Sequence, residues 1–147
     1  MENFELARTL VNERELKEEN LSEAKSILHK LNKNNPDPNN FGLLCEIQYL
    51  EGELAPQNEK IPIYKEGIEY GKKGIEIDNS HLESNFWLSV NYGLLGDNQG
   101  MMNSVFLLEP IETHVTKAVN INESYFFGAP LRVLGYFYHK IPGWPIS

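Results

Sequence analysis

Apolar residues recur at helical spacing along most of this chain, and the clearest stretch covers residues 79–97. The positions that form its stripe are Leu88, Ser89, Tyr92 and Leu95. They stand at i, i+1, i+4 and i+7, which places them on one face of a helix with 3.6 residues per turn. Gly96-Asp97 then predicts the end of this helix, because glycine readily adopts the left-handed conformation of a C-terminal cap.

The same pattern predicts an all-α chain of about seven helices. Antiparallel helical hairpins are expected at about 3–35, 39–78 and 80–121, followed by an unpaired helix at 129–140. The segment 34–38 separates the first two hairpins, because proline and the residue before it are disfavoured in helices. Within the third hairpin, a long or broken helix is expected over about 100–120 with a kink at Pro110. We therefore expect one domain over residues 1–147.

The helix expected at 63–77 contains a ridge of glycines. Gly67, Gly71 and Gly74 stand at i, i+4 and i+7, so they share one helix face. Each glycine costs about 1 kcal/mol relative to alanine in a helix interior. The pattern favours close packing of a neighbouring helix, and the alternative is a bare backbone surface for a ligand or partner.

The charge balance narrows the classes of partner. The 147 residues include 13 Lys and Arg against 21 Asp and Glu, a net charge of −8, so we expect no binding to nucleic acid phosphates. No apolar run approaches the roughly 18–20 residues that a transmembrane helix needs. The N-terminal residues MENFELARTL lack the basic start and apolar core of a signal peptide. Cys45 is the single cysteine, so no intrachain disulfide is possible. Cysteine usage therefore does not indicate whether the protein resides in an oxidising or a reducing compartment.

Catalytic and metal-binding motifs are missing from the sequence. The histidines are His29, His81, His114 and His139. None stands in the HExxH or Cys-containing spacing of a metal site, and no GxSxG, Walker or dinucleotide-binding glycine motif occurs. The weakest hypothesis is an enzyme whose catalytic carboxylates are Glu109 and Glu112, beside the expected kink. We expect no enzyme activity, no metal and no cofactor.

Two stretches carry a family resemblance. Leu134, Gly135 and Tyr138 repeat the order Leu88, Ser89 and Tyr92, a pattern typical of the first helix of a tetratricopeptide repeat. FWLSVNYGLLGD at 86–97 and GAPLRVLGYFYHKIPGWPIS at 128–147 together resemble the T-component of TRAP transporters, a family of tetratricopeptide-like bacterial lipoproteins that are often periplasmic. The resemblance implies a right-handed solenoid of stacked hairpins that is non-catalytic and that can form rings. It also implies a periplasmic location, whereas the residues alone leave a cytoplasmic one open.

In such repeats the first helices line a concave groove. The positions expected there are Glu83, Phe86, Val90, Gly93, Ala129, Arg132, Tyr136 and His139. An exposed aromatic ring beside an arginine suits a peptide or a carboxylate, through stacking and bidentate pairing. The alternative is that Phe86 and Tyr136 pack on neighbouring helices. Our leading hypothesis is a scaffold or adaptor that binds a protein partner or peptide in this groove, and the alternative is a small-ligand-binding component of a TRAP-type transport system.

The helix expected at 129–140 has no partner helix after Pro145. Its apolar residues, with one from the tail, are Leu131, Leu134, Tyr138 and Trp144. Repeat units bury such faces only against neighbours. These residues are therefore expected to contact another copy of the chain, to fold back, or to come from a longer parent protein.

Overall fold

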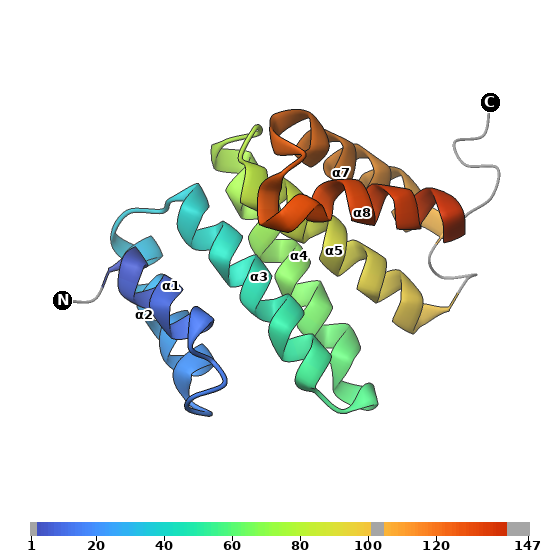
Figure 1. Cartoon of the computed structure of the whole chain (residues 1–147). Coiled ribbons are helices and arrows are strands. Elements are labelled where there is room, and N and C mark those ends of the chain that lie inside the picture. Colours follow the sequence, from blue (N-terminus) through green and yellow to red (C-terminus); the bar gives the residue numbers. More distant parts are fainter. Residues whose placement is uncertain (1–2, 101–104, 141–147) are drawn as a thin grey trace.

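The computed structural model describes residues 3–100 and 105–140, which fold into helices joined by short turns (Figure 1). The α-helices are α1 (Phe4–Asn12), α2 (Asn20–Asn34), α3 (Pro38–Leu54), α4 (Lys60–Ile77), α5 (Leu82–Gln99), α7 (Leu108–Asn122) and α8 (Tyr125–Lys140). Two 3₁₀ turns, η1 (Gln57–Glu59) and η2 (Val105–Leu107), precede α4 and α7. Within the described ranges there are seven α-helices and no strand, so the predicted all-α fold is confirmed.

The helices lie side by side in chain order. In Figure 1, α1 and α2 stand at one end, α3 and α4 follow, and α8 lies across α5 and α7 at the other end. Helix α5 is central, because it packs on α3, α4 and α7. The larger cluster of buried apolar residues reaches from Ala7 on α1 to Ala129 on α8. This arrangement leaves one face of α5 between α3 and α8.

Side-chain caps fix where two of the central helices begin. Asp37 accepts a hydrogen bond from the backbone N–H of Asn39 at 2.8 Å, directly before Pro38 opens α3. The Nδ1 atom of His81 accepts from the backbone N–H of Ser84 at 3.2 Å, at the start of α5. Such caps stabilise a helix because its first N–H groups have no intrahelical acceptor.

The glycine ridge of α4 packs against α5. A Cβ atom at Gly67 would lie 2.6 Å from Asn91 Oδ1, and one at Gly71 would lie 2.9 Å from Leu88 Cβ. Both distances are shorter than a van der Waals contact. The ridge therefore serves close helix packing and is not a bare surface for a ligand.

Two of the expected helix features are wrong. Helix α5 continues past Gly96-Asp97 to Gln99, and Gly100, with φ of 86°, follows it as the left-handed residue. Pro110 is the third residue of α7, where its missing N–H removes no helical hydrogen bond, so it starts a helix and does not kink one. Residues 101–104, where the expected long helix begins, lie outside the described residues.

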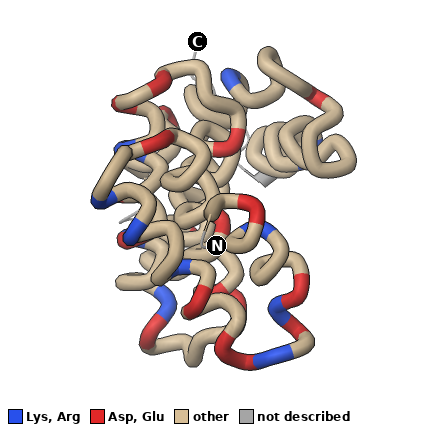
Figure 2. The backbone as a smooth tube through the Cα atoms, turned by 90° about the vertical axis from the view of Figure 1, so that its left-hand side faces the viewer, with Lys and Arg blue, Asp and Glu red and all other residues tan. Residues whose placement is uncertain are grey.

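Charged residues of both signs are interspersed along most of the tube in Figure 2. Helix α8 differs, because Arg132 and Lys140 are its only residues of the Asp, Glu, Lys and Arg type. None of the helices in the described ranges is both long enough and apolar enough to cross a membrane.

Candidate functional site

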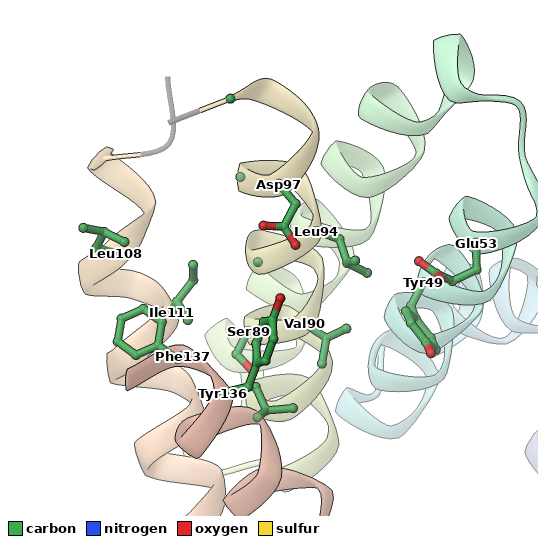
Figure 3. Close-up of a pocket in the computed structure, with 14 residues that line it drawn as sticks. Tyr49, Glu53, Ser89, Val90, Leu94, Asp97, Leu108, Ile111, Tyr136 and Phe137 are labelled. Carbon is green, nitrogen blue, oxygen red and sulfur yellow. The ribbon is translucent and has the colours of Figure 1, made fainter. Parts of the chain in front are cut away.

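An open groove of about 670 Å³ follows α5, with α3 on one side and α7 and α8 on the other (Figure 3). Pockets of roughly 300–1,000 Å³ are typical of ligand sites. The groove is lined by Tyr49, Glu53, Ser89, Val90, Gly93, Leu94, Gly96, Asp97, Gly100, Leu108, Ile111, Val133, Tyr136 and Phe137. Its surface is mainly apolar, and among these lining residues two are acidic and none is basic.

Helix α5 forms the floor of the groove. Val90 and Leu94 supply apolar surface, and the Ser89 hydroxyl donates to the Phe86 carbonyl at 2.6 Å, so it is satisfied within the helix. A Cβ atom at Gly93 would meet no atom within 4 Å. Gly93 therefore leaves open space in the groove, although a glycine there costs about 1 kcal/mol relative to alanine.

The wall from α3 consists of Tyr49 and Glu53, one helical turn apart. The buried Tyr64 of α4 donates from its hydroxyl to Glu53 Oε1 at 2.9 Å, which fixes the position of this carboxylate. The ring of Tyr49 packs against Trp87 with 5.2 Å between centroids. Burial, together with the nearby Glu53 charge, raises the pKa of Tyr49 because the phenolate is poorly solvated there.

The opposite wall includes α8, which starts with a left-handed turn. Residues 126–128 have φ of 48°, 59° and 78°, a region that non-glycine residues rarely adopt. The Trp87 indole N–H donates to the Tyr125 hydroxyl at 3.2 Å, just before the turn. After it, the Arg132 guanidinium donates to the carbonyl of Phe127. These contacts at both ends of the turn hold it in place and set the direction in which α8 crosses the groove.

The groove residues expected from the sequence are divided by the fold. Val90, Gly93 and Tyr136 line the observed groove, and the Tyr136 side chain is 59% exposed. Phe86 is 2% exposed and packs edge-on against Trp87 with 4.8 Å between ring centroids. Phe86 thus contributes to the core and offers no surface to a ligand.

The other expected groove residues lie elsewhere. Glu83 Oε2 is 3.2 Å from His81 Nε2 near the start of α5. Arg132 is engaged by the turn at 126–128, Ala129 is buried, and His139 is exposed without lining the groove. The expected pairing of an aromatic ring with an arginine is therefore not what lines the groove.

The residues expected to contact another copy lie on α8 with one exception. Leu131 is 46% exposed, Tyr138 is 39% exposed and Leu134 is half-buried. Trp144 lies outside the described residues. An oligomer stays a prediction.

Several groove residues were not identified from the sequence. They include Tyr49, Glu53, Leu94, Asp97, Leu108, Val133 and Phe137. Tyr49 and Glu53 stand at i, i+4, so phasing α3 in the same way as α5 would have found them. Whether Leu108 and Val133 line the groove depends on how α7 and α8 cross α5, and no local sequence pattern specifies those crossings.

His29, His81 and His114 make contacts within the fold. His29 Nε2 lies 3.2 Å from the Tyr70 hydroxyl, and His114 Nδ1 lies 3.0 Å from Asn85 Oδ1. Burial lowers the pKa of both His29 and His114, because the imidazolium form loses hydration. In the described part of the chain, no three His, Cys, Asp or Glu side chains converge as they would around a metal ion.

Comparison with known families corrects the expected assignment. The model of the family Regulator of microtubule dynamics protein 1-3 matches residues 4–142, whereas no curated protein matches the chain. The assignment to tetratricopeptide repeats and the T-component of TRAP transporters is therefore wrong. The two stretches behind it differ in environment, since Ser89 is buried but a Cβ at Gly135 would meet no atom within 4 Å. The shared pattern thus reflects helical periodicity, and the chain belongs to the Regulator of microtubule dynamics protein 1-3 family.

Proposed function

We propose that this chain is a non-catalytic interaction module that holds an apolar segment of a partner protein in the groove along α5. In this proposal the hairpins stack as a right-handed solenoid, and the groove is its concave face. The observation that carries the proposal is the open space of about 670 Å³ between apolar residues of α5, α7 and α8. Two tyrosines, Tyr49 and Tyr136, stand at its sides, and tyrosine is enriched at protein interfaces.

Gly93 also supports a groove that takes an occupant. It lies in the middle of α5, lines the groove and has open space where its side chain would be. An alanine or leucine there would give a more stable helix. The glycine is therefore better explained by room for a bound group than by the packing of the chain itself.

The family description favours a protein as the occupant. The family is described as regulators of microtubule dynamics, and microtubules are themselves protein polymers. A small apolar molecule is the second candidate, because the volume is also in the range of small-molecule pockets. The two candidates differ in the size of ligand that competes for the groove.

The test uses a groove-filling variant and a matched control. Peptides of about 16 residues, selected from a random displayed library on the wild-type protein, are measured by fluorescence anisotropy against Gly93→Leu and Gly135→Leu. Both glycines face open space within a helix, but only Gly93 lines the groove. We expect Gly93→Leu to weaken binding at least about tenfold and Gly135→Leu to leave it within about twofold.

As a control, the circular dichroism spectra of both variants should match that of the wild type, which checks that they are folded. Peptides that bind Gly93→Leu as tightly as the wild type would overturn the groove as the binding site. For the small-molecule candidate, the dye 8-anilinonaphthalene-1-sulfonate is bound to the same proteins. A dye that Gly93→Leu excludes, together with a library that yields no peptide, would favour the second candidate.

A further inference from the structure

We infer that the outward face of α8 binds a second copy of this chain, as an antiparallel pair of α8 helices that cross at Gly135. Leu131, Gly135 and Tyr138 stand at i, i+4 and i+7, so they form one stripe along α8. All three residues are exposed. The inference does not depend on the groove along α5, because none of the three lines it.

The opposite side of α8 packs on the rest of the chain. Ala129 and Phe137 are buried on that side, and α8 packs on α7. In Figure 1, α8 is the last helix in the row and lies across α5 and α7. An apolar stripe on the outer side of the last helix meets water unless another molecule covers it, and exposed apolar patches mark protein interaction sites.

Gly135 is the residue that lets a second helix come close. A Cβ atom at Gly135 would meet no atom within 4 Å, so packing within the described part of the chain does not require a glycine there. Glycine is unfavourable in a helix interior relative to alanine. On an exposed face, however, it allows another backbone to approach, because no side chain separates the two. A helix of another molecule therefore accounts for Gly135.

The stripe is complementary to itself in the antiparallel direction. When two α8 helices cross at Gly135, the two glycines face each other and Leu131 of each copy lies opposite Tyr138 of the other. Bulky side chains on both sides of the crossing then fill the space beside the glycines. A two-fold contact of this kind uses the same patch on both copies and closes as a dimer.

The distribution of charge selects α8 for a contact between two copies. The net charge of −8 makes two copies repel each other over much of their surfaces. Among the α-helices of the described ranges, α8 is the one that contains neither Asp nor Glu. Arg132 lies beside the stripe, about 100° around the helix from Leu131. Glu112 of α7 reaches the stripe at its edge, where it is hydrogen-bonded to the Tyr138 hydroxyl.

Sedimentation velocity of the 147-residue chain from about 5 µM to about 500 µM tests the dimer. We expect a monomer–dimer equilibrium with a dissociation constant of about 10–100 µM, because one pair of helices buries less than a standard interface. Raising NaCl from about 50 mM to about 500 mM should tighten the dimer about two- to fivefold, because salt screens the repulsion between the copies. A chain that stays monomeric throughout would overturn the inference.

Matched variants identify the surface. We expect Leu131→Glu and Gly135→Leu each to weaken the dimer at least about tenfold, the first by placing a charge in an apolar contact and the second by blocking the close approach. The control is Leu16→Glu, an equal change of charge at a residue that is 75% exposed and lies outside α8. It should change the dimer less than about twofold. Circular dichroism spectra that match the wild type check that each variant is folded.

Disulfide cross-linking tests the direction of the pair. Gly135→Cys should form a disulfide-linked dimer under oxidised glutathione, because the crossing brings the two positions 135 together, whereas Leu16→Cys should not. An equimolar mixture of Leu131→Cys and Tyr138→Cys should form the mixed dimer at least about fivefold more than Leu131→Cys alone forms its own dimer. Cys45 is buried in all of these proteins and does not compete.

The outcomes separate this inference from the groove. A dimer that Gly135→Leu leaves unchanged or tightens, or that Leu16→Glu weakens as much as Leu131→Glu does, would overturn the α8 contact. Cross-linking of Leu131→Cys with itself in preference to Tyr138→Cys would overturn the antiparallel pairing. Gly93→Leu closes the groove and should leave the dimer within about twofold, so failure of one proposal does not imply failure of the other.

Discussion

Asn91 on α5 and Gly67 on α4 are packed so closely that a Cβ atom at Gly67 would lie 2.6 Å from Asn91 Oδ1. The Asn91 side chain is held in that position, because its amide donates to the carbonyls of Cys45 at 3.1 Å and Trp87 at 3.0 Å. A side chain at position 67 therefore cannot be accommodated by a simple movement of Asn91. This contact fixes the distance between α4 and α5.

We expect Gly67→Ala to lower the free energy of unfolding by about 1–3 kcal/mol, because overpacking outweighs the gain in helix propensity. The control is Gly93→Ala on the same pair of helices, where the new methyl group meets open space. That change should raise the free energy of unfolding by up to about 1 kcal/mol. Urea unfolding followed by circular dichroism measures both, and a Gly67→Ala protein as stable as the wild type would contradict the close contact.

Helix α1 is attached to α3 through an ion pair. The Arg8 guanidinium contacts both carboxylate oxygens of Glu46, at 2.8 and 2.9 Å, and Glu46 is 5% exposed. We expect Arg8→Ala to cost about 2–4 kcal/mol of unfolding free energy, because it leaves a buried carboxylate without its cation. Urea unfolding of Arg8→Ala and of the double variant Arg8→Met with Glu46→Leu tests this, and the double variant should recover most of the loss.

The control for this ion pair is an exposed one. Lys72 Nζ lies 3.8 Å from Glu69 on the surface of α4, and Lys72→Ala should change stability by less than about 0.5 kcal/mol. Equal losses for Arg8→Ala and Lys72→Ala would show that burial of Glu46 does not determine the energy.

The sequence predicted what local chemistry determines. The breaker before Pro38, the ridge from Gly67 to Gly74 and the stripe around Leu88 each depend on residues that are close in the chain, and the structure has helices at each place. The family could not be read in this way, because helix periodicity is common to many all-α proteins.

The groove was predictable only in part. Helix phasing predicts Val90 and Tyr136 as groove residues. It does not predict Glu53 and Asp97, the two acidic residues that line the groove. The sequence predicts a helix end at Gly96-Asp97, whereas α5 continues to Gln99 and keeps the Asp97 carboxylate on a helical face. The position of α8 along the groove depends on the left-handed turn at 126–128. Phe126 and Phe127 do not favour the positive φ values of this turn, so the local sequence does not predict it.

Tyr125 connects the start of α8 to α5 through Trp87. Removing its hydroxyl in Tyr125→Phe should cost about 0.5–1.5 kcal/mol, because the Trp87 indole N–H loses its acceptor. Burial raises the pKa of Tyr125 from 10.0 to about 12. A raised folded-state pKa contributes stability that is complete below the unfolded pKa and is lost as the pH rises through the folded one.

The wild type should therefore lose more stability than Tyr125→Phe between about pH 10 and pH 12. Urea unfolding at a series of alkaline pH values measures the difference between the two proteins, and the other buried tyrosines contribute equally to both. Parallel stability curves for the two proteins would show that Tyr125 titrates as an exposed tyrosine does.

His114 on α7 provides the corresponding prediction at acid pH. Its Nδ1 atom lies 3.0 Å from Asn85 Oδ1, and the Asn85 amide already donates to the carbonyls of His81 and Asn79, so the histidine N–H is the donor. Burial and the nearby Lys117 lower the pKa of His114 from 6.5. The neutral form is favoured in the folded state, so its contribution to stability is present above the unfolded pKa and is lost as the pH falls through the folded one.

The His114 ring protons should titrate with a midpoint below 6.5 in an NMR pH series of the folded protein. His114→Gln keeps a side-chain N–H for Asn85 but does not titrate, so its stability should fall less steeply than that of the wild type as the pH decreases from about 7 to about 5. His29 is shifted in the same direction and remains in both proteins, so the difference between them isolates His114. A His114 midpoint at or above 6.5 would mean that water reaches this ring between α5 and α7 in solution, and the contact with Asn85 would then not be a stable part of the fold.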